Sequence, residues 1–284
     1  MMNETHRTAL VTGATSGIGK ATAEALARQG MTVVLVARDA QKGRAVVEEI
    51  RSKSGNPNVD VLLADLSAQA AIRQLAGEFR GKYSELHVLV NNAGGVFGSR
   101  KLTADGLEYT FAFNHLAYFL LTNLLLDTLK ASAPARIVNV SSGAQGMGKI
   151  NFADLQGEQH YSAQAAYSQS KLANVLFTYA LARRLEGTGV TANVLHPGVV
   201  RTQFGRVETP LLWRMLFPLI DPFMLTPEKG AATAIYLAAS PEVEGVSGQY
   251  FTKQKAVRAN AIASDQAVQD RLWEVSAQLT QLDG

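Results

Sequence analysis

The sequence predicts an α/β protein in which one doubly wound parallel sheet of about seven strands carries helices on both faces. Short runs rich in β-branched and apolar residues alternate with longer stretches of helical periodicity along the chain. Several of the short runs are apolar throughout, as is typical of strands that are buried on both faces. This alternation indicates parallel β–α–β units with right-handed crossovers. We therefore expect a single domain over residues 1–284.

The expected elements follow one another without a repeat, a low-complexity tract or a linker. The predicted strands span residues 9–12, 32–37, 59–64, 86–91, 136–141, 191–196 and 248–252. The predicted helices span residues 17–30, 40–53, 68–81, 103–130 and 162–187. Two stretches, 143–161 and 203–226, depart from this rhythm and are expected to be functional loops. The second is apolar but broken by prolines, which suits a substrate lid or a surface helix docked on the core.

The composition excludes several classes of protein. The chain has 284 residues, of which 47% are hydrophobic and 18% are charged, so it is not a disordered polyelectrolyte. It contains no cysteine, which excludes disulfides, zinc–thiolate sites, iron–sulfur clusters and cysteine nucleophiles. Its five histidines lack the spacing of metal ligands, so no metal site is expected.

Charge and hydropathy restrict the partners of the chain. The net charge of +3 comes from 27 basic and 24 acidic residues spread along the sequence, so no nucleic-acid surface is expected and an anionic ligand is favoured. The N-terminus lacks the pattern of a secretory signal, and the apolar stretches 112–126 and 211–225 are interrupted by polar or charged residues. We therefore expect no transmembrane anchor and a cytoplasmic location.

A glycine-rich loop joins the first predicted strand to the first predicted helix. Gly13, Gly17 and Gly19 occur in the order GxxxGxG, which lets the backbone turn sharply and approach a pyrophosphate. The free N–H groups and the positive dipole end of the following helix attract the same anion. A glycine turn without a ligand is one alternative; a Walker loop is another, but this window lacks its first glycine and its Ser/Thr. The motif favours a Rossmann-type dinucleotide site.

Residues after the next two strands favour NADP(H) as the cofactor and leave NAD(H) possible. The second strand ends at Ala37 and is followed by Arg38, whose guanidinium pairs well with a 2′-phosphate. Asp39 keeps NAD(H) open, and Arg38 could also be a solvated loop charge. Asp65 and Leu66 follow the third strand, where an adenine ring would lie, although Asp65 also suits the N-cap region of the next helix.

A phenol, an ammonium and a hydroxyl form the candidate chemical site. Tyr167 and Lys171 lie four residues apart in a helical pattern and therefore share a face. A phenol titrates near pH 10, and a nearby ammonium lowers its pKa toward a range useful for proton transfer. Ser142 follows the fifth strand, at the sheet edge where the nucleotide would lie. A lone YxxxK pair is common by chance, and Ser141 and Ser142 also suit a turn, so the prediction depends on the combination.

Taken in order, these motifs resemble the short-chain dehydrogenase/reductases. The resemblance covers roughly residues 7–252 and is carried by TGATSGIG, NNAG, Asn114, the Ser142/Tyr167/Lys171 set and HPGVVRT. The segments ARIVNVSSGAQ, INFADLQGEQHY and AYSQSKLANVLFTYALARRL are similar to the retinol dehydrogenase-like branch. That branch shares the wide separation between Ser142 and Tyr167.

The resemblance implies a role for each motif. Tyr167 would be the acid/base, Lys171 would hold the nicotinamide ribose and lower the Tyr167 pKa, and Ser142 would polarise the substrate oxygen. Asn114 would bind a water that links Lys171 to solvent, or would simply bond backbone inside a helix. The residues that would bind the cofactor are Gly13, Ser16, Gly17, Ile18, Gly19, Arg38, Asp65, Leu66, Asn92, Ala93, Gly94, Tyr167, Lys171, Pro197, Gly198 and Thr202.

We therefore expect an NADP(H)-dependent oxidoreductase that transfers a hydride between the nicotinamide and a carbonyl or alcohol of a fairly apolar small molecule. The apolarity is inferred from lid side chains such as Trp213 and Phe217. A non-catalytic NAD(P)-sensing protein with the same fold is the alternative. A sugar-nucleotide epimerase would need a different glycine spacing and a longer C-terminal region. The family commonly assembles through helices matching 103–130 and 162–187, so a homodimer or homotetramer is expected.

Overall fold

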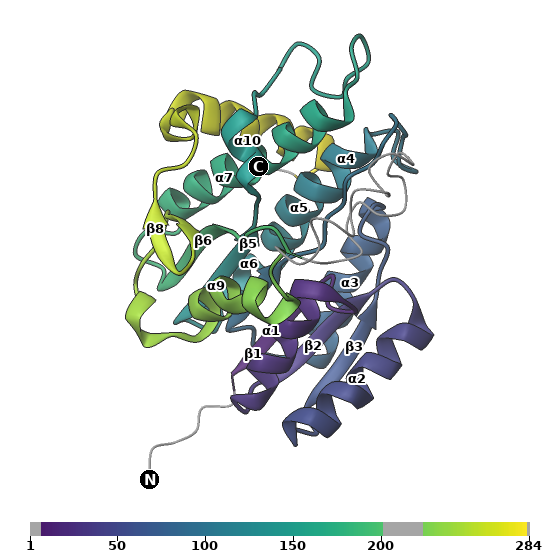
Figure 1. Cartoon of the computed structure of the whole chain (residues 1–284), viewed down its shortest axis with the longest axis vertical. Coiled ribbons are helices and arrows are strands. Elements are labelled where there is room, and N and C mark those ends of the chain that lie inside the picture. The colour runs from purple at the N-terminus through teal and green to yellow at the C-terminus, as the bar shows by residue number, and fades with distance from the viewer. Residues whose placement is uncertain (1–6, 201–223, 283–284) are drawn as a thin grey trace.

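One eight-stranded sheet forms the centre of the computed structural model, which describes residues 7–200 and 224–282 (Figure 1). The strands lie in the order β3-β2-β1-β4-β5-β6-β7-β8. They are β1 (Thr8–Thr12), β2 (Thr32–Ala37), β3 (Val59–Leu63), β4 (Val88–Asn91), β5 (Ala135–Val140), β6 (Val190–His196), β7 (Tyr250–Thr252) and β8 (Lys255–Val257). The chain winds outward from β1 to β3 and then returns to β4 on the other side of β1. The predicted doubly wound parallel sheet is confirmed, and its switch point lies between β1 and β4.

The eighth strand is a correction to the predicted count of about seven. β8 pairs antiparallel with β7, from Tyr250 opposite Val257 to Thr252 opposite Lys255. The connecting turn holds Lys253 at φ 50° and Gln254 at φ 61°, in the left-handed region that Gly and Asn usually occupy in such hairpins. β8 is also short and exposed. It therefore has neither the apolar run nor the turn residues by which a sequence indicates a strand.

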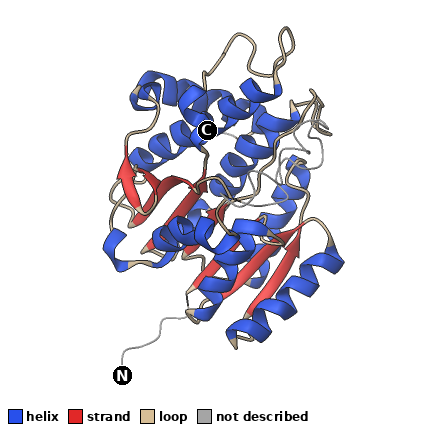
Figure 2. Cartoon of the chain, in the orientation of Figure 1, coloured by secondary structure: helices blue, strands red, loops and turns tan. Residues whose placement is uncertain are grey.

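Helices cover both faces of the sheet (Figure 2). One core joins β1 and β2 to α1 (Gly17–Arg28), α2 (Ala40–Ser54) and α9 (Pro227–Ala239). A second core, on the other face, involves α3 (Gln69–Lys82), α5 (Ala117–Leu124), α6 (Leu126–Ala131) and α7 (Ala163–Arg184). The C-terminal helix α10 (Gln266–Thr280) packs against α7 in a third core, so α7 is buried between the sheet and α10. The short 3₁₀ turns are η2 (Gly143–Met147), η4 (Pro241–Val243) and η5 (Ala261–Ser264).

The helix predicted over 103–130 is broken into several pieces. Gly106 turns at φ 75°, and the Glu108 carboxylate then accepts the Thr110 and Phe111 N–H groups, so α4 (Tyr109–Phe111) begins only there. A π-helical turn, η1 (Ala112–Leu116), follows and leads into α5. Such turns are frequent at functional sites. Apolar periodicity alone does not reveal the extra residue that η1 accommodates.

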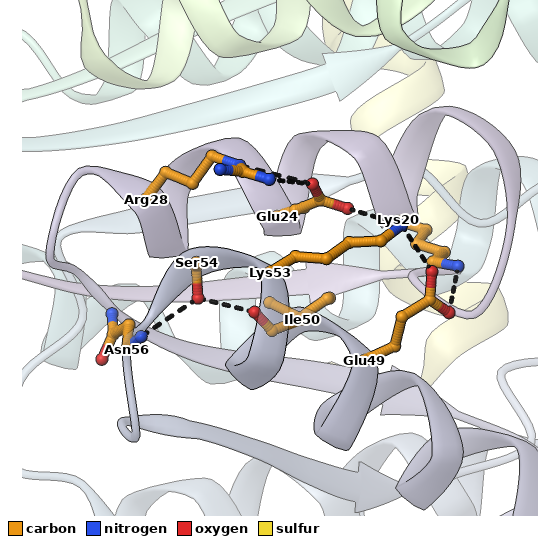
Figure 3. A network of polar contacts seen from close by, with 8 residues as sticks. All are labelled: Lys20, Glu24, Arg28, Glu49, Ile50, Lys53, Ser54 and Asn56. Carbon is orange, nitrogen blue, oxygen red and sulfur yellow. Dashed lines mark hydrogen bonds and ion pairs between the residues drawn. The ribbon is translucent and has the colours of Figure 1, made fainter.

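A network of charged side chains joins α1 to α2 (Figure 3). Glu49 of α2 pairs with Lys20 of α1 at 2.6 Å and with Lys53 at 2.7 Å, and Glu24 of α1 pairs with Arg28 at 2.9 Å. All five side chains keep contact with solvent. The two neighbouring lysines hold the pKa of Glu49 below its usual range. The network joins the exposed surface of α1, the helix that follows the glycine loop, to that of α2.

Candidate active site

The glycine loop between β1 and α1 is shaped to receive an anion. Gly13 lies at φ 64° and Gly17 at φ 56°, and a Cβ on Gly13 would come within 2.8 Å of the Ala93 Cα. A Cβ on Gly19 would collide with the Gly13 carbonyl oxygen. The side chain of Ser16 does not cap α1, so the first N–H groups of this helix remain available to a ligand. These features fit the pyrophosphate of a dinucleotide.

The loop after β4 is fastened to the end of β1. The Thr12 hydroxyl accepts the N–H groups of Asn92 and Ala93 at 2.8 and 3.0 Å, and the Asn92 amide donates to the Thr12 carbonyl at 2.9 Å. A Cβ on Gly94 would lie only 3.2 Å from the Lys171 Nζ. The small residues after β4 therefore bring the backbone close to Lys171, the candidate catalytic lysine.

Ser142, Tyr167 and Lys171 line one cavity of about 400 Å³ together with the glycine loop. Ser142 follows β5, where its hydroxyl accepts the Ala144 N–H at 3.2 Å and shares a hydrogen bond with the Tyr167 phenol. Lys171 lies one turn beyond Tyr167 on α7, with its Nζ 5.8 Å from the centre of the phenol ring. Ser141 instead donates to the Lys171 carbonyl at 2.7 Å. The Ser141 hydroxyl thus bonds backbone, whereas the Ser142 hydroxyl meets the Tyr167 phenol.

Burial controls the ionisation of the candidate catalytic groups. Lys171 is 2% exposed, and burial lowers its pKa to about 7. Its Nζ donates to the Val140 carbonyl at 3.3 Å. Burial raises the pKa of Tyr167, and the hydrogen bond with Ser142 opposes this only in part. The predicted lowering of the Tyr167 pKa is thus not found, because desolvation disfavours the phenolate and also weakens the charge on Lys171.

Asn114 is fully buried in η1, where its side chain joins two neighbouring segments. Its side chain accepts the Gly95 N–H at 2.8 Å and donates to the Gly95 carbonyl at 2.9 Å. The same amide donates to the Ser170 hydroxyl at 3.0 Å, which ties the loop after β4 to α7. The geometry therefore matches the alternative in which the Asn114 side chain bonds backbone groups. The backbone carbonyl of Asn114 in turn accepts the Asn174 side-chain amide at 2.9 Å.

Comparison with known proteins now identifies the family. The family model described as short chain dehydrogenase matches residues 7–210. The chain belongs to the short-chain dehydrogenase family. It is therefore a dehydrogenase/reductase that acts on alcohol or carbonyl groups with a nicotinamide cofactor.

Individual relatives place this short-chain dehydrogenase in the retinol dehydrogenase-like branch, as its motifs predict. Retinol dehydrogenase 14 of Mus musculus is 47% identical over 282 residues, which covers 95% of this chain and 84% of that protein. Polyprenol dehydrogenase of Homo sapiens is 44% identical over 287 residues, covering 96% and 85%. The RhlG/NADP active-site complex of Pseudomonas aeruginosa matches the structure with a TM-score of 0.68 and 31% identity, covering 86% and 93%.

Most of the predicted site residues of this short-chain dehydrogenase converge on the cavity. Those that line it are Gly13, Ser16, Gly17, Ile18, Asn92, Ala93, Gly94, Ser142, Tyr167, Lys171, Pro197 and Gly198. Gly19 and Asn114 lie behind this lining and support it. Thr202 and almost all of the candidate lid 203–226 lie outside the described residues.

Three predicted cofactor residues lie away from the lining. Arg38 is exposed just beyond β2, and the Asp39 carboxylate caps α2 by accepting the Lys42 N–H at 2.7 Å. Asp65 accepts the N–H and the hydroxyl of Ser67, at 3.0 and 2.8 Å, so it shapes the turn after β3. Leu66 packs into a hydrophobic core. A contact of these residues with a cofactor remains a prediction.

Several residues that shape the site were not among the predicted site residues. The additional lining residues are Thr15, Phe113, Val140, Ser141 and Val200. His196 fastens two loops, because its Nδ1 accepts the Gly143 N–H at 3.0 Å and the Gly198 N–H at 3.4 Å. Burial lowers the pKa of His196, which favours this neutral form. The position of Val140 and His196 at strand ends is a signal that could have indicated them, whereas no pattern marks Phe113.

The described ranges, 7–200 and 224–282, contain neither a candidate metal site nor a helix that could span a membrane. Within them, no group of three or more His, Cys, Asp or Glu side chains could hold a metal ion. Within the same ranges, no helix combines the length and the apolarity needed to cross a bilayer.

Proposed function

We propose that the protein is an NADP(H)-dependent oxidoreductase that interconverts an apolar aldehyde or ketone and its alcohol. The observation that carries this proposal is the convergence of Ser142, Tyr167 and Lys171 on the cavity that also contains the glycine loop. The related proteins named as retinol and polyprenol dehydrogenases support an apolar alcohol as the substrate. A non-catalytic sensor would not need these three side chains together.

Two features favour NADP(H) over NAD(H). Arg38 is an exposed guanidinium just beyond the tip of β2, suited to pair with a phosphate on the adenosine ribose. Asp39, the residue that kept NAD(H) open, already uses its carboxylate to cap α2. The related RhlG complex, which contains NADP, supports the same preference.

The cavity residues have separate roles in the proposed reaction. When bound, the nicotinamide supplies or accepts the hydride. A substrate oxygen placed between Ser142 and Tyr167 would accept a hydrogen bond from each hydroxyl. The raised pKa of Tyr167 keeps the phenol protonated near neutral pH, which prepares it to donate a proton during carbonyl reduction. Lys171 stabilises the phenolate that remains, and Asn114 holds the loop that closes the cavity behind it.

The test is a turnover assay with retinaldehyde and with shorter aldehydes and ketones. The purified protein should oxidise NADPH, followed at 340 nm, and Tyr167→Phe should lower kcat by at least a thousandfold because the proton donor is lost. Tyr236→Phe is the matched control, since it removes a phenol hydroxyl that pairs with Glu242 outside the cavity lining, and it should keep most of the activity. Cofactor binding without turnover on the whole panel would instead favour the sensor.

We also retain the expected homo-oligomer and cytoplasmic location as proposals. Helix α10 packs over α7, so an interface in this region would have to include α10. Light scattering that gives the mass of one chain would overturn the oligomer. Sedimentation of the protein with the membrane fraction would overturn the location.

A further inference from the structure

Asn174 and Lys171 donate to the same backbone oxygen. Asn174 lies one turn beyond Lys171 on α7, and its Nδ2 lies 3.4 Å from the Val140 carbonyl oxygen. The Lys171 Nζ lies 3.3 Å from that oxygen, so the two nitrogens are at most 6.7 Å apart. The Asn174 Nδ2 also donates to the Asn114 carbonyl at 2.9 Å. One amide therefore touches the acceptor of the candidate catalytic lysine and the backbone of the candidate catalytic asparagine.

A buried chain of hydrogen bonds fixes the orientation of the Asn174 side-chain amide. Backbone carbonyls only accept, so the NH₂ group of Asn174 must face Val140 and Asn114, and its Oδ1 must face His115. His115 Nδ1, 3.2 Å from that oxygen, then carries the proton. His115 Nε2 accepts the Ser276 hydroxyl of α10 at 2.9 Å. Burial lowers the pKa of His115 to about 4, so this neutral arrangement holds at physiological pH.

A second buried network on the same helix serves as a comparison for a purely structural role. Thr178, one turn beyond Asn174, accepts the Asn139 amide at 2.9 Å, and Asn139 accepts the Asn91 amide at 2.9 Å. These side chains are also fully buried. Their hydrogen bonds reach neither Lys171 nor Asn114, and the Thr178 hydroxyl meets Asn174 only at its backbone carbonyl, at 2.6 Å. Burial alone therefore does not explain why the Asn174 network ends on two carbonyls of the candidate site.

We propose that Asn174 is a positioning residue for Lys171 and Asn114, and that His115 and Ser276 hold its amide in the required orientation. This inference rests on the proposed function, in which Lys171 acts on the phenol and the cofactor. It makes α10 part of the active-site structure, although this helix contributes no residue to the described lining of the cavity. Asn174 itself touches no reacting atom.

The surroundings of Lys171 allow a test in which a negative charge is introduced near its ammonium group. The aromatic rings of Tyr118 and Tyr167 lie 5.7 and 5.8 Å from its Nζ, and His115 follows beyond Asn174. Among the ion pairs formed by the described residues, none involves Lys171. A carboxylate at position 174 would thus be a new anion near Lys171. An anion at this separation raises the pKa of an ammonium group.

The experiment compares Asn174→Asp and Asn174→Leu with Thr178→Val as the matched control. Lysine side-chain NMR, with the Lys171 signal assigned from its loss in Lys171→Arg, should show a pKa at least one unit higher in Asn174→Asp. The alkaline limb of retinaldehyde reduction should move to higher pH by a similar amount. Asn174→Leu should lower kcat at least tenfold with less than a threefold change in KM. Thr178→Val should lower Tm comparably but keep kcat within threefold.

These measurements distinguish an error in this inference from an error in the proposed function. An unchanged Lys171 pKa in Asn174→Asp would overturn the positioning role even if the wild-type protein turns over NADPH. Equal losses of kcat in Asn174→Leu and Thr178→Val would overturn it too, because they would indicate general destabilisation. If the wild-type protein shows no turnover, the proposed function fails, and the NMR titration still decides whether Asn174 is coupled to Lys171.

Discussion

The molecule contains two polar networks of similar size that differ in charge and in contact with water. The α1–α2 network is made of ionised side chains that keep contact with solvent, with Glu49 between two lysines. The network behind the active site is neutral apart from Lys171, and its members Asn174, His115 and Ser276 are fully buried. In the first, water can replace any partner that is lost. In the second it cannot, so each hydrogen bond also fixes an orientation.

This difference indicates where the sequence can change at low cost. Exposed ion pairs typically contribute between 0 and about 1 kcal/mol, because water and salt screen them. A buried polar group that loses its partner costs roughly 1–3 kcal/mol. The buried network should therefore dominate both the stability of the protein and the geometry of the site.

The largest expected effect is a loss of stability in acid that originates at His115. Its pKa in the folded protein is about 4, below the ordinary value of 6.5, so the unfolded chain binds the proton more tightly. Stability is therefore present above pH 6.5 and is lost as the pH falls from 6.5 toward 4. At 1.36 kcal/mol per pKa unit, the loss is about 3 kcal/mol.

Urea unfolding at several pH values measures this contribution. The His115→Gln variant should lose most of the pH dependence in that window. His87→Gln, which removes a half-buried imidazole with a lowered pKa, should remove a smaller part. Equal effects of the two substitutions would contradict the special role of the buried network.

An intermediate effect is expected at Arg38, an exposed charge whose proposed partner is a ligand. Arg38→Ala should weaken NADPH binding at least tenfold, about 1.4 kcal/mol, because a charge-assisted hydrogen bond to phosphate is lost. NADH binding should change less than threefold. Isothermal titration calorimetry with both cofactors measures these affinities. Equal losses of affinity for NADPH and NADH would show that Arg38 does not bind the 2′-phosphate.

The smallest effect is expected in the exposed network. Glu49→Gln removes a carboxylate that pairs with Lys20 and Lys53, yet it should lower the unfolding free energy by less than about 1 kcal/mol. The difference from wild type should shrink further in 1 M NaCl, where charges are screened. A loss that exceeds the effect of His115→Gln at neutral pH would reverse the ranking of the two networks.

Local patterns predicted the fold and the position of the glycine loop well. Apolar runs located seven strands, and the glycine spacing located the loop, because both depend on neighbouring residues. The broken helix around Asn114 and the strand β8 were missed, since a π-helical turn and an exposed three-residue strand leave no periodic signal.

The buried network was missed for a different reason. His115 is separated from Asn174 by 59 residues and from Ser276 by 161, and only folding brings them together. The Tyr167 pKa was predicted in the wrong direction because spacing shows which groups are near but not how strongly burial desolvates them.

We expect the hydride and the proton to be exchanged in the cavity at the ends of β1, β4 and β5. A crystal structure of the protein with NADP⁺ tests this most directly. The pyrophosphate should lie on the glycine loop, the nicotinamide ribose against Lys171, and the nicotinamide ring within reach of a substrate oxygen held by Ser142 and Tyr167. A nicotinamide bound outside this cavity, or facing away from Tyr167, would show that the exchange takes place elsewhere.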